Sequence, residues 1–189
     1  MLLIKTEFLI LQFFKMKLNN SNNDYEIPYK NLKDGFHNFE FILGDAFFEG
    51  FELSEIKKGQ IAAAIELEKK TDMLVLAFNI SGYVEVACDI CLEKFKMAVS
   101  TSRVLYVKFG QADQEVSEDV LILAYASNAF DCSHYLYEFI HLALPMRRTH
   151  EMSMVSGDCC DIEMIKQLEA LKERKSSNLH YWEELKKLK

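Results

Sequence analysis

Cys88 and Cys91, in the order Cys-Asp-Ile-Cys, are the residues whose types and spacing are best suited to chemistry. Two cysteines with two residues between them offer two thiolate ligands to a soft metal ion, or two sulfurs that form a redox-active disulfide. The same spacing also fits an ordinary turn that carries two free thiols. The spacing leaves these three alternatives open, and the surrounding residues have to separate them.

A structural zinc ion needs four ligands, of which Cys88 and Cys91 supply two. The other two would come from the C-terminal part of the chain, where His150, Cys159 and Cys160 stand, and such a site would fasten that part to the cysteine loop. Because Cys159 and Cys160 are adjacent, they are poorly placed to bind one ion together. We therefore expect free, partly buried thiols and no cofactor, and we keep zinc as the alternative.

A redox role is the least favoured of the three. Reactive Cys-x-x-Cys pairs lie at a helix N-terminus or beside cations that stabilise the thiolate. Here strand-like segments flank the loop, and Asp89 and Glu93 add negative charge, so we expect Cys88 and Cys91 to be unreactive thiols. The sequence also has no pattern that pairs a nucleophile with a base and no glycine-rich phosphate loop. We expect a protein that is not an enzyme and takes no small-molecule substrate.

The residues before the cysteine loop predict antiparallel strands. Apolar and polar residues alternate over 39–43 and 61–67, which is the period of a half-buried strand. Residues 69–72 predict a turn, after which residues 73–80 return with apolar side chains on both faces. Ser81-Gly82 is expected to break or bulge that strand.

The residues after the loop continue the same pattern. Residues 83–88 predict the strand that leads into the cysteine loop, and alternation over 95–109 predicts the strand that leaves it. The acidic stretch 111–119 is expected to be a solvated loop, and residues 120–125 a final strand. The cysteines are thus expected to lie in a turn of an antiparallel meander.

A helix is predicted to cover this sheet. Ser133 is a suitable N-cap, Pro145 ends the pattern, and apolar residues recur at the spacing of a buried helix face. That face consists of Leu136, Phe139, Ile140 and Ala143. The predicted fold class is α+β: a curved antiparallel meander covered by one helix, with a C-terminal helical arm.

The chain divides into three parts. We interpret residues 1–15 as an upstream extension or a disordered start, 16–145 as the α+β domain and 146–189 as the helical arm. The stretch 1–14 is rich in apolar residues, but Glu7 interrupts it, and Lys15 and Lys17 follow rather than precede it, unlike in a signal peptide. Within the arm, Asp161 and Asn178 are expected to cap two short helices, which need the domain or a partner to be stable.

Charge and cysteine content limit the classes of function. The net charge of -7 argues against a protein that coats nucleic acid with its whole surface. Five cysteines, an odd number, do not form a secreted disulfide framework, and without a transmembrane run we expect a cytoplasmic protein. Basic clusters in the C-terminal third are candidates for binding a partner or RNA, although acidic neighbours make a solvated helix face an equal alternative. These candidates are Arg147, Arg148, Lys172, Arg174, Lys175, Trp182, Lys186 and Lys187.

Three motifs together resemble a known family. The chain has Cys88-x-x-Cys91-Leu92-Glu93-x-Phe95, then Glu138-Phe139-Ile140-x-Leu142-Ala143-Leu144-Pro145, and it ends with Trp182-Glu183-Glu184-Leu185-Lys186-Lys187-Leu188-Lys189. From Met16 onward this order is similar to that of the YceD family, the large ribosomal RNA subunit accumulation proteins. There are two departures. Cys159-Cys160 replaces only part of a second cysteine pair that many relatives carry, and Asn178-Leu179-His180-Tyr181 replaces their aspartate-proline-arginine and aromatic residue.

The resemblance implies a non-enzymatic bacterial factor that supports accumulation or processing of large-subunit (23S) ribosomal RNA, and hence assembly of the large ribosomal subunit. The implied partners are a precursor of that subunit, a basic ribosomal protein or ribosomal RNA. We hypothesise that the acidic chain, with its segment 115–119, escorts a basic ribosomal protein. A zinc-stapled RNA-binding module is the second hypothesis, and a thiol oxidoreductase is the third.

Overall fold

The structure, a computed structural model, describes residues 25–177, and for residues 172–177 it describes the backbone only. The strands are β1 (Glu26–Ile27), β2 (Gly35–Leu43), β3 (Gly59–Lys69), β4 (Met73–Ala87), β5 (Lys94–Gly110), β6 (Gln114–Ser117), β7 (Val120–Ala124) and β8 (Phe130–Asp131). The helices are α2 (Asp45–Glu49), α3 (Ser133–Leu142) and α4 (Ile162–Ser177), and the short 3-10 turns are η1 (Tyr29–Asn31) and η2 (His150–Met152). Among the described residues, no helix is long and apolar enough to span a bilayer.

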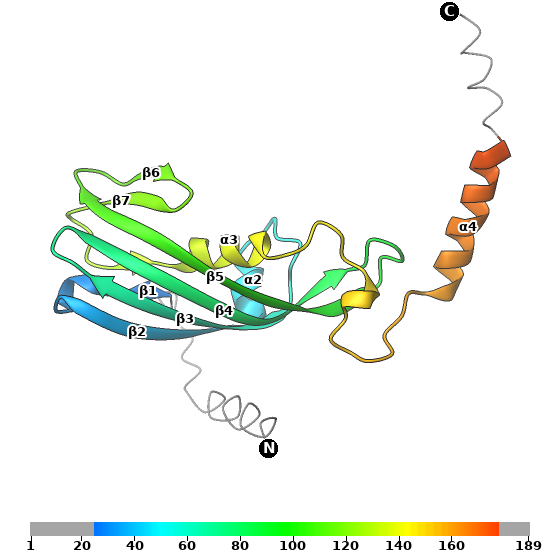
Figure 1. The fold of residues 1–189 in the computed structure, drawn as a ribbon, viewed down its shortest axis with the longest axis horizontal. Coiled ribbons are helices and arrows are strands. Elements are labelled where there is room, and N and C mark those ends of the chain that lie inside the picture. Colours follow the sequence, from blue (N-terminus) through cyan, green and yellow to red (C-terminus); the bar gives the residue numbers. More distant parts are fainter. Residues whose placement is uncertain (1–24, 178–189) are drawn as a thin grey trace, which may run out of the picture.

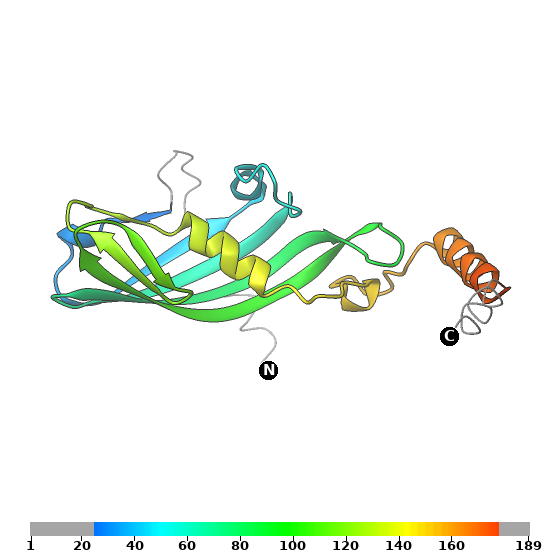
Figure 2. The same cartoon turned by 90° about the horizontal axis from the view of Figure 1, so that it is seen from above.

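One large sheet dominates the molecule. Its strand order is β2-β3-β4-β5-β7-β6, and β2 to β5 form a continuous antiparallel meander. The sheet is strongly curved, and α3 lies along its inner face (Figures 1 and 2). The predicted α+β fold, a curved antiparallel sheet covered by a helix, is confirmed.

The core lies between the sheet and α3. Alternate residues of β3 and β4 are buried, as their apolar pattern predicts, and α3 buries Leu136, Phe139 and Ile140 against them. The ring of Phe78 meets the ring of Phe139 edge-on, with 5.2 Å between the centroids. Helix α2, which the sequence pattern did not predict, joins this layer, and just beyond it Phe51 stacks on Tyr137 of α3 at 3.9 Å. The core therefore holds α3 in a fixed position on the sheet.

The expected break at Ser81-Gly82 is wrong, because β4 runs without interruption through both residues. Gly82 pairs with Ile61 of β3 in an unshifted register. Its φ of +155° is one that L side chains rarely adopt, and a Cβ there would lie 2.2 Å from the carbonyl oxygen of Gln60. Glycine thus lets the two backbones approach closely while the ladder continues.

We expect Gly82→Ala to lower the free energy of unfolding by about 2 to 3 kcal/mol, because it adds both backbone strain and a clash with β3. Gly44→Ala is the matched control, since a Cβ at Gly44 meets nothing within 4 Å, and its effect should stay within about 0.5 kcal/mol. Urea denaturation of both variants measures the difference. Equal stabilities would contradict the close approach of β3 and β4 at Gly82.

The segment after β5 also differs from expectation. Residues 114–117, expected to be loop, form β6, which pairs with β7 as an antiparallel neighbour. Strand β7 lies between β6 and β5, parallel to β5, so the meander ends at β5. Strand β7 is not the last strand either, because β8 follows and pairs with β1. The acidic residues correctly predicted that this segment is exposed. They did not distinguish a strand from a loop, because an exposed edge strand is as polar as a loop.

The helix starts confirm one predicted cap and correct another. Cys132, not Ser133, occupies the N-cap of α3, and the Asp131 carboxylate accepts a hydrogen bond from the Ser133 N–H at 2.8 Å. At the start of α4, the Asp161 carboxylate accepts from the Glu163 N–H at 2.9 Å, as predicted. The cap predicted at Asn178 lies outside the described residues, as do residues 1–15.

The segment between α3 and α4 runs along the far end of the sheet. Ser153 forms a β-bridge with Met97 of β5, and the Met154 N–H donates to the Lys96 carbonyl at 2.9 Å. Beyond it, α4 projects away from the sheet (Figures 1 and 2). This segment therefore carries His150 and Cys160 past the turn between β4 and β5. The division of the chain at residues 145 and 146 stays a prediction.

Candidate metal centre

Cys88 and Cys91 lie in the tight turn between β4 and β5. The Cys88 N–H donates to the Glu93 carbonyl, and the Leu92 N–H donates to the Cys88 carbonyl, both at 2.9 Å. The Ile90 N–H points to the Cys88 sulfur at 3.4 Å. Leu92 has a φ of 65°, in the left-handed region that non-glycine residues seldom adopt. These contacts fix the shape of the turn and direct a backbone dipole at one of its sulfurs.

Arg148 fastens the C-terminal segment to this turn. Its N–H donates to the Asp89 carboxylate at 2.6 Å, and its carbonyl accepts from the Asp89 N–H at 2.8 Å. Its guanidinium lies 3.1 Å from the Glu55 carboxylate. His150 follows two residues after Arg148, and the pairing of Arg148 with Asp89 brings it beside the cysteines.

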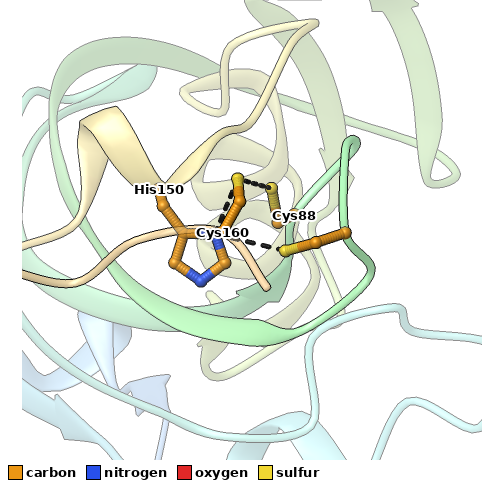
Figure 3. Close-up of side chains that lie close together, drawn as sticks. Cys88, His150 and Cys160 are labelled. Atoms are coloured by element: carbon orange, nitrogen blue, oxygen red, sulfur yellow. Dashed lines mark hydrogen bonds between the residues drawn. The ribbon is translucent and has the colours of Figure 1, made fainter. Parts of the chain in front are cut away.

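Four potential ligands gather at this point, from three separate places in the sequence. The Nδ1 atom of His150 lies 3.5 Å from the sulfur of Cys91 and 3.5 Å from that of Cys160. The sulfurs of Cys88 and Cys160 are 3.7 Å apart, and Figure 3 shows the Cys160 sulfur in contact with both Cys88 and the His150 ring. All four ligand atoms lie within 4.8 Å of one another. The cluster Cys88, Cys91, His150 and Cys160 is thus arranged as a group that is able to hold a metal ion.

Three of the four residues of the cluster are buried, and Cys160 is half-buried. Cys88 is fully buried, Cys91 is 3 % exposed and His150 is 6 % exposed. The ring of Phe95 packs on the imidazole, with 5.0 Å between the centroids. Cys88, Cys91 and His150 are therefore largely shielded from solvent.

Asp158 orients the histidine. Its Oδ1 atom lies 3.7 Å from Nε2 of His150, the ring nitrogen that faces away from the sulfurs. The hydroxyl of Ser153 donates to its other oxygen, Oδ2, at 2.7 Å. A carboxylate behind the imidazole favours the tautomer with the proton on Nε2, which leaves the lone pair of Nδ1 directed at the sulfurs.

The sulfurs of the cluster differ in acidity. Burial disfavours the Cys88 thiolate, but hydrogen bonds from the N–H groups of Cys91 and Ile90 and from His150 outweigh it and lower the pKa of Cys88 to about 6. Burial, together with the hydrogen bonds and charges of Cys88 and Cys91, raises the pKa of Cys160 to about 11. The Cys88 thiolate therefore forms readily, and its negative charge disfavours ionisation of Cys160.

This result bears on one expectation from the sequence. The carboxylates of Asp89 and Glu93 were expected to keep both loop thiols unreactive. The pKa of Cys88 is nevertheless lowered, because the N–H groups directed at its sulfur and the hydrogen bonds of His150 outweigh the effect of burial. Cys132 behaves differently: it is buried at the N-terminus of α3, and burial with the charge of Asp131 raises its pKa.

The predicted zinc ligands separate into two groups. Cys160 and His150 join Cys88 and Cys91, whereas Cys159 is exposed and stays outside the cluster. Adjacent residues of an extended segment point to opposite sides, so only one of the two cysteines turns inward. Asp158 and Ser153 were missed, because nothing in the sequence distinguishes them from other polar residues of a loop.

The predicted basic contacts are spread over several environments. Arg147 is exposed, while Arg148 is half-buried and paired with Glu55. Lys172, Arg174 and Lys175 lie in α4 where only the backbone is described, and Trp182, Lys186 and Lys187 lie outside the described residues. Their role in binding a partner or RNA stays a prediction.

Comparisons with known proteins found one similarity. The family model described as large ribosomal RNA subunit accumulation protein YceD matches residues 76–189, which is more than half of the chain. The match begins inside β4 and includes all four residues of the cluster. The comparisons with curated proteins and with solved structures found no match.

Proposed function

The chain belongs to the YceD family of large ribosomal RNA subunit accumulation proteins, and from this premise we propose that it supports the accumulation or processing of large-subunit (23S) ribosomal RNA in a bacterium. The observation that carries the proposal is the extent of the match, which includes the cysteine turn, α3 and α4 in one continuous stretch. In this role the protein acts in the cytoplasm, where bacterial ribosomes assemble.

The protein acts as a binding factor rather than as an enzyme. The imidazole of His150 pairs with the thiols of Cys91 and Cys160, and all three groups belong to the cluster. Its geometry suits an ion better than a substrate, because both sulfurs share a single ring nitrogen. An assembly factor needs surfaces that recognise a precursor, and no step of that role requires a reactive group.

The partner that we propose is a basic ribosomal protein in the precursor of the large subunit. The net charge of -7 favours a cationic partner. Residues 115–119, which include three carboxylates, are all exposed on and beside the edge strand β6. Complementary charge at such an edge raises the association rate and keeps the basic partner from binding RNA prematurely.

A ribosome gradient from the native bacterium tests this function. We expect the tagged protein to migrate with immature large subunits, and a strain that lacks it to contain fewer large subunits and more unprocessed 23S precursor. Replacing Glu115 and Glu118 with glutamine is expected to weaken recovery of a crosslinked basic ribosomal protein, because it removes two of the three exposed carboxylates. Normal large-subunit levels in the deletion strain would disprove the function, and unchanged recovery would disprove the proposed partner.

The second candidate function is a zinc-stapled RNA-binding module. The observation that favours it is the cluster, beside which Arg147 is exposed. Zinc sites of this size often hold short nucleic-acid-binding segments that have little core of their own. In the same crosslinking experiment, 23S RNA attached to the segment around Arg147 would favour this candidate, and a crosslinked ribosomal protein would favour the first.

A further inference from the structure

We propose that Cys88, Cys91, His150 and Cys160 bind one Zn²⁺ ion in a closed tetrahedral site, and that this ion fastens the segment before α4 to the turn between β4 and β5. The proposal deepens the second candidate function, because it identifies the ligands and the segment that the metal holds. It rests on that function only for a connection to RNA, since metal binding itself is a property of the isolated chain.

Three of the distances between ligand atoms match the edges of a zinc tetrahedron. With Zn–S bonds of about 2.3 Å and Zn–N bonds of about 2.0 to 2.1 Å, two sulfurs are about 3.8 Å apart and a sulfur and a nitrogen about 3.5 Å apart. The sulfurs of Cys88 and Cys160 are 3.7 Å apart. The two sulfur-to-Nδ1 distances, from Cys91 and Cys160 to His150, are both 3.5 Å. Three of the six edges therefore have nearly the length that one central ion would impose.

The types of ligand select zinc among the common metals. Three thiolates and one imidazole are a frequent set in structural zinc sites, whereas calcium and magnesium require oxygen ligands. Four protein ligands leave no open coordination position for water or substrate. The site is therefore structural, in agreement with the burial of Cys88, Cys91 and His150.

A disulfide accounts for the arrangement less well. A bond between Cys88 and Cys160 would need a sulfur-to-sulfur distance of about 2.05 Å, well below the observed 3.7 Å. It would also leave Cys91 and His150 close to each other in the interior with no ligand to bind. A single ion satisfies all four groups at once.

The surroundings of the cluster are those of a metal site as well. Ligating histidines usually direct the N–H of their second ring nitrogen at a carboxylate, and the Asp158 carboxylate lies 3.7 Å from Nε2 of His150. Ser153 holds that carboxylate in turn, at 2.7 Å. The Ile90 N–H, directed at the Cys88 sulfur, stabilises a thiolate ligand. Groups beyond the four ligands thus orient the His150 ring and stabilise the Cys88 thiolate.

The position of Cys160 explains what the ion does for the fold. Cys160 is the last ligand in the chain, and α4 begins two residues later at Ile162. Between η2 and α4 the segment has only a few backbone contacts with the sheet, among them the bridge of Ser153 to Met97. A bond from the ion to Cys160 fixes the point from which α4 projects.

The adjacent cysteines allow a stringent test on the full-length protein. We expect one zinc per chain in native mass spectrometry of reduced protein expressed with added zinc, less than a tenth of that content in Cys160→Ser, and full content in the matched control Cys159→Ser. Equal zinc content in the two variants would overturn the assignment of the ligands. Wild-type protein without zinc would overturn the site itself, as would protein purified without reductant that carries no zinc and has a mass two hydrogens lower from a Cys88–Cys160 disulfide.

Asp158→Asn provides a second measurement if Cys160→Ser does not fold. It keeps all four ligands, and we expect its zinc affinity, measured by competition with a chelating dye, to be about 10- to 100-fold weaker. Unchanged affinity would show that Asp158 does not orient His150 toward a metal. Both zinc measurements use the isolated protein. A negative result in the ribosome gradient therefore does not contradict zinc binding, and an absence of zinc does not contradict the proposed role in ribosome assembly.

Discussion

Stripping the metal from the purified protein with a strong chelator is expected to lower the free energy of unfolding by about 4 kcal/mol, the contribution of a ligand present at 1,000 times its Kd. The ligands come from residues 88–91, 150 and 160, which meet only in the folded chain. The ion therefore binds the folded state almost exclusively, and its binding energy becomes folding energy.

Hydrogen exchange with and without chelator is the measurement that locates this effect. We expect amide protection to fall in residues 148–161, which the ion holds against the turn, and to persist in β3 and the first half of β4. Cys160→Ser serves as the control, because a variant without metal should not respond to the chelator. A uniform loss of protection, or an equal response in Cys160→Ser, would mean that the chelator does not act through this site.

Replacing Phe78 with alanine is expected to lower the free energy of unfolding by about 4 kcal/mol, which is a large share of the stability of an ordinary domain. The side chain is 1 % exposed and packs edge-on against Phe139 of α3 at 5.2 Å. Its removal leaves a cavity between sheet and helix and also removes the aromatic contact. The contact that holds α3 on the sheet is thereby weakened.

Urea denaturation followed by circular dichroism checks this prediction. Phe36→Ala is the matched control, because Phe36 lies on the outer face of the edge strand β2 and is 69 % exposed. The same truncation should cost less than about 1 kcal/mol there, since little area returns to water. Similar losses in the two variants would contradict the assignment of the core to the face that α3 covers.

The sequence by itself determined most of the sheet. Alternation of apolar and polar residues predicted β2, β3 and the long β5, because each buries one face of the sheet and exposes the other. It did not predict the continuity of β4 through Gly82, because a glycine that breaks a strand and one that admits a neighbouring backbone are identical in sequence. The sequence also did not predict that β7 pairs with β5 in parallel, since a residue pattern indicates a strand but does not say which strand pairs with it.

The same division applies to the candidate metal centre. The spacing of Cys88 and Cys91 predicted a turn with two nearby sulfurs, because that relation is local in the chain. Only the tertiary structure decided that Cys160 and His150 join them and that Cys159 turns away, since these choices depend on a segment about 60 residues further along and on its contacts at Asp89. Local spacing fixes local geometry, whereas ligands from distant segments meet through contacts that the whole fold must first establish.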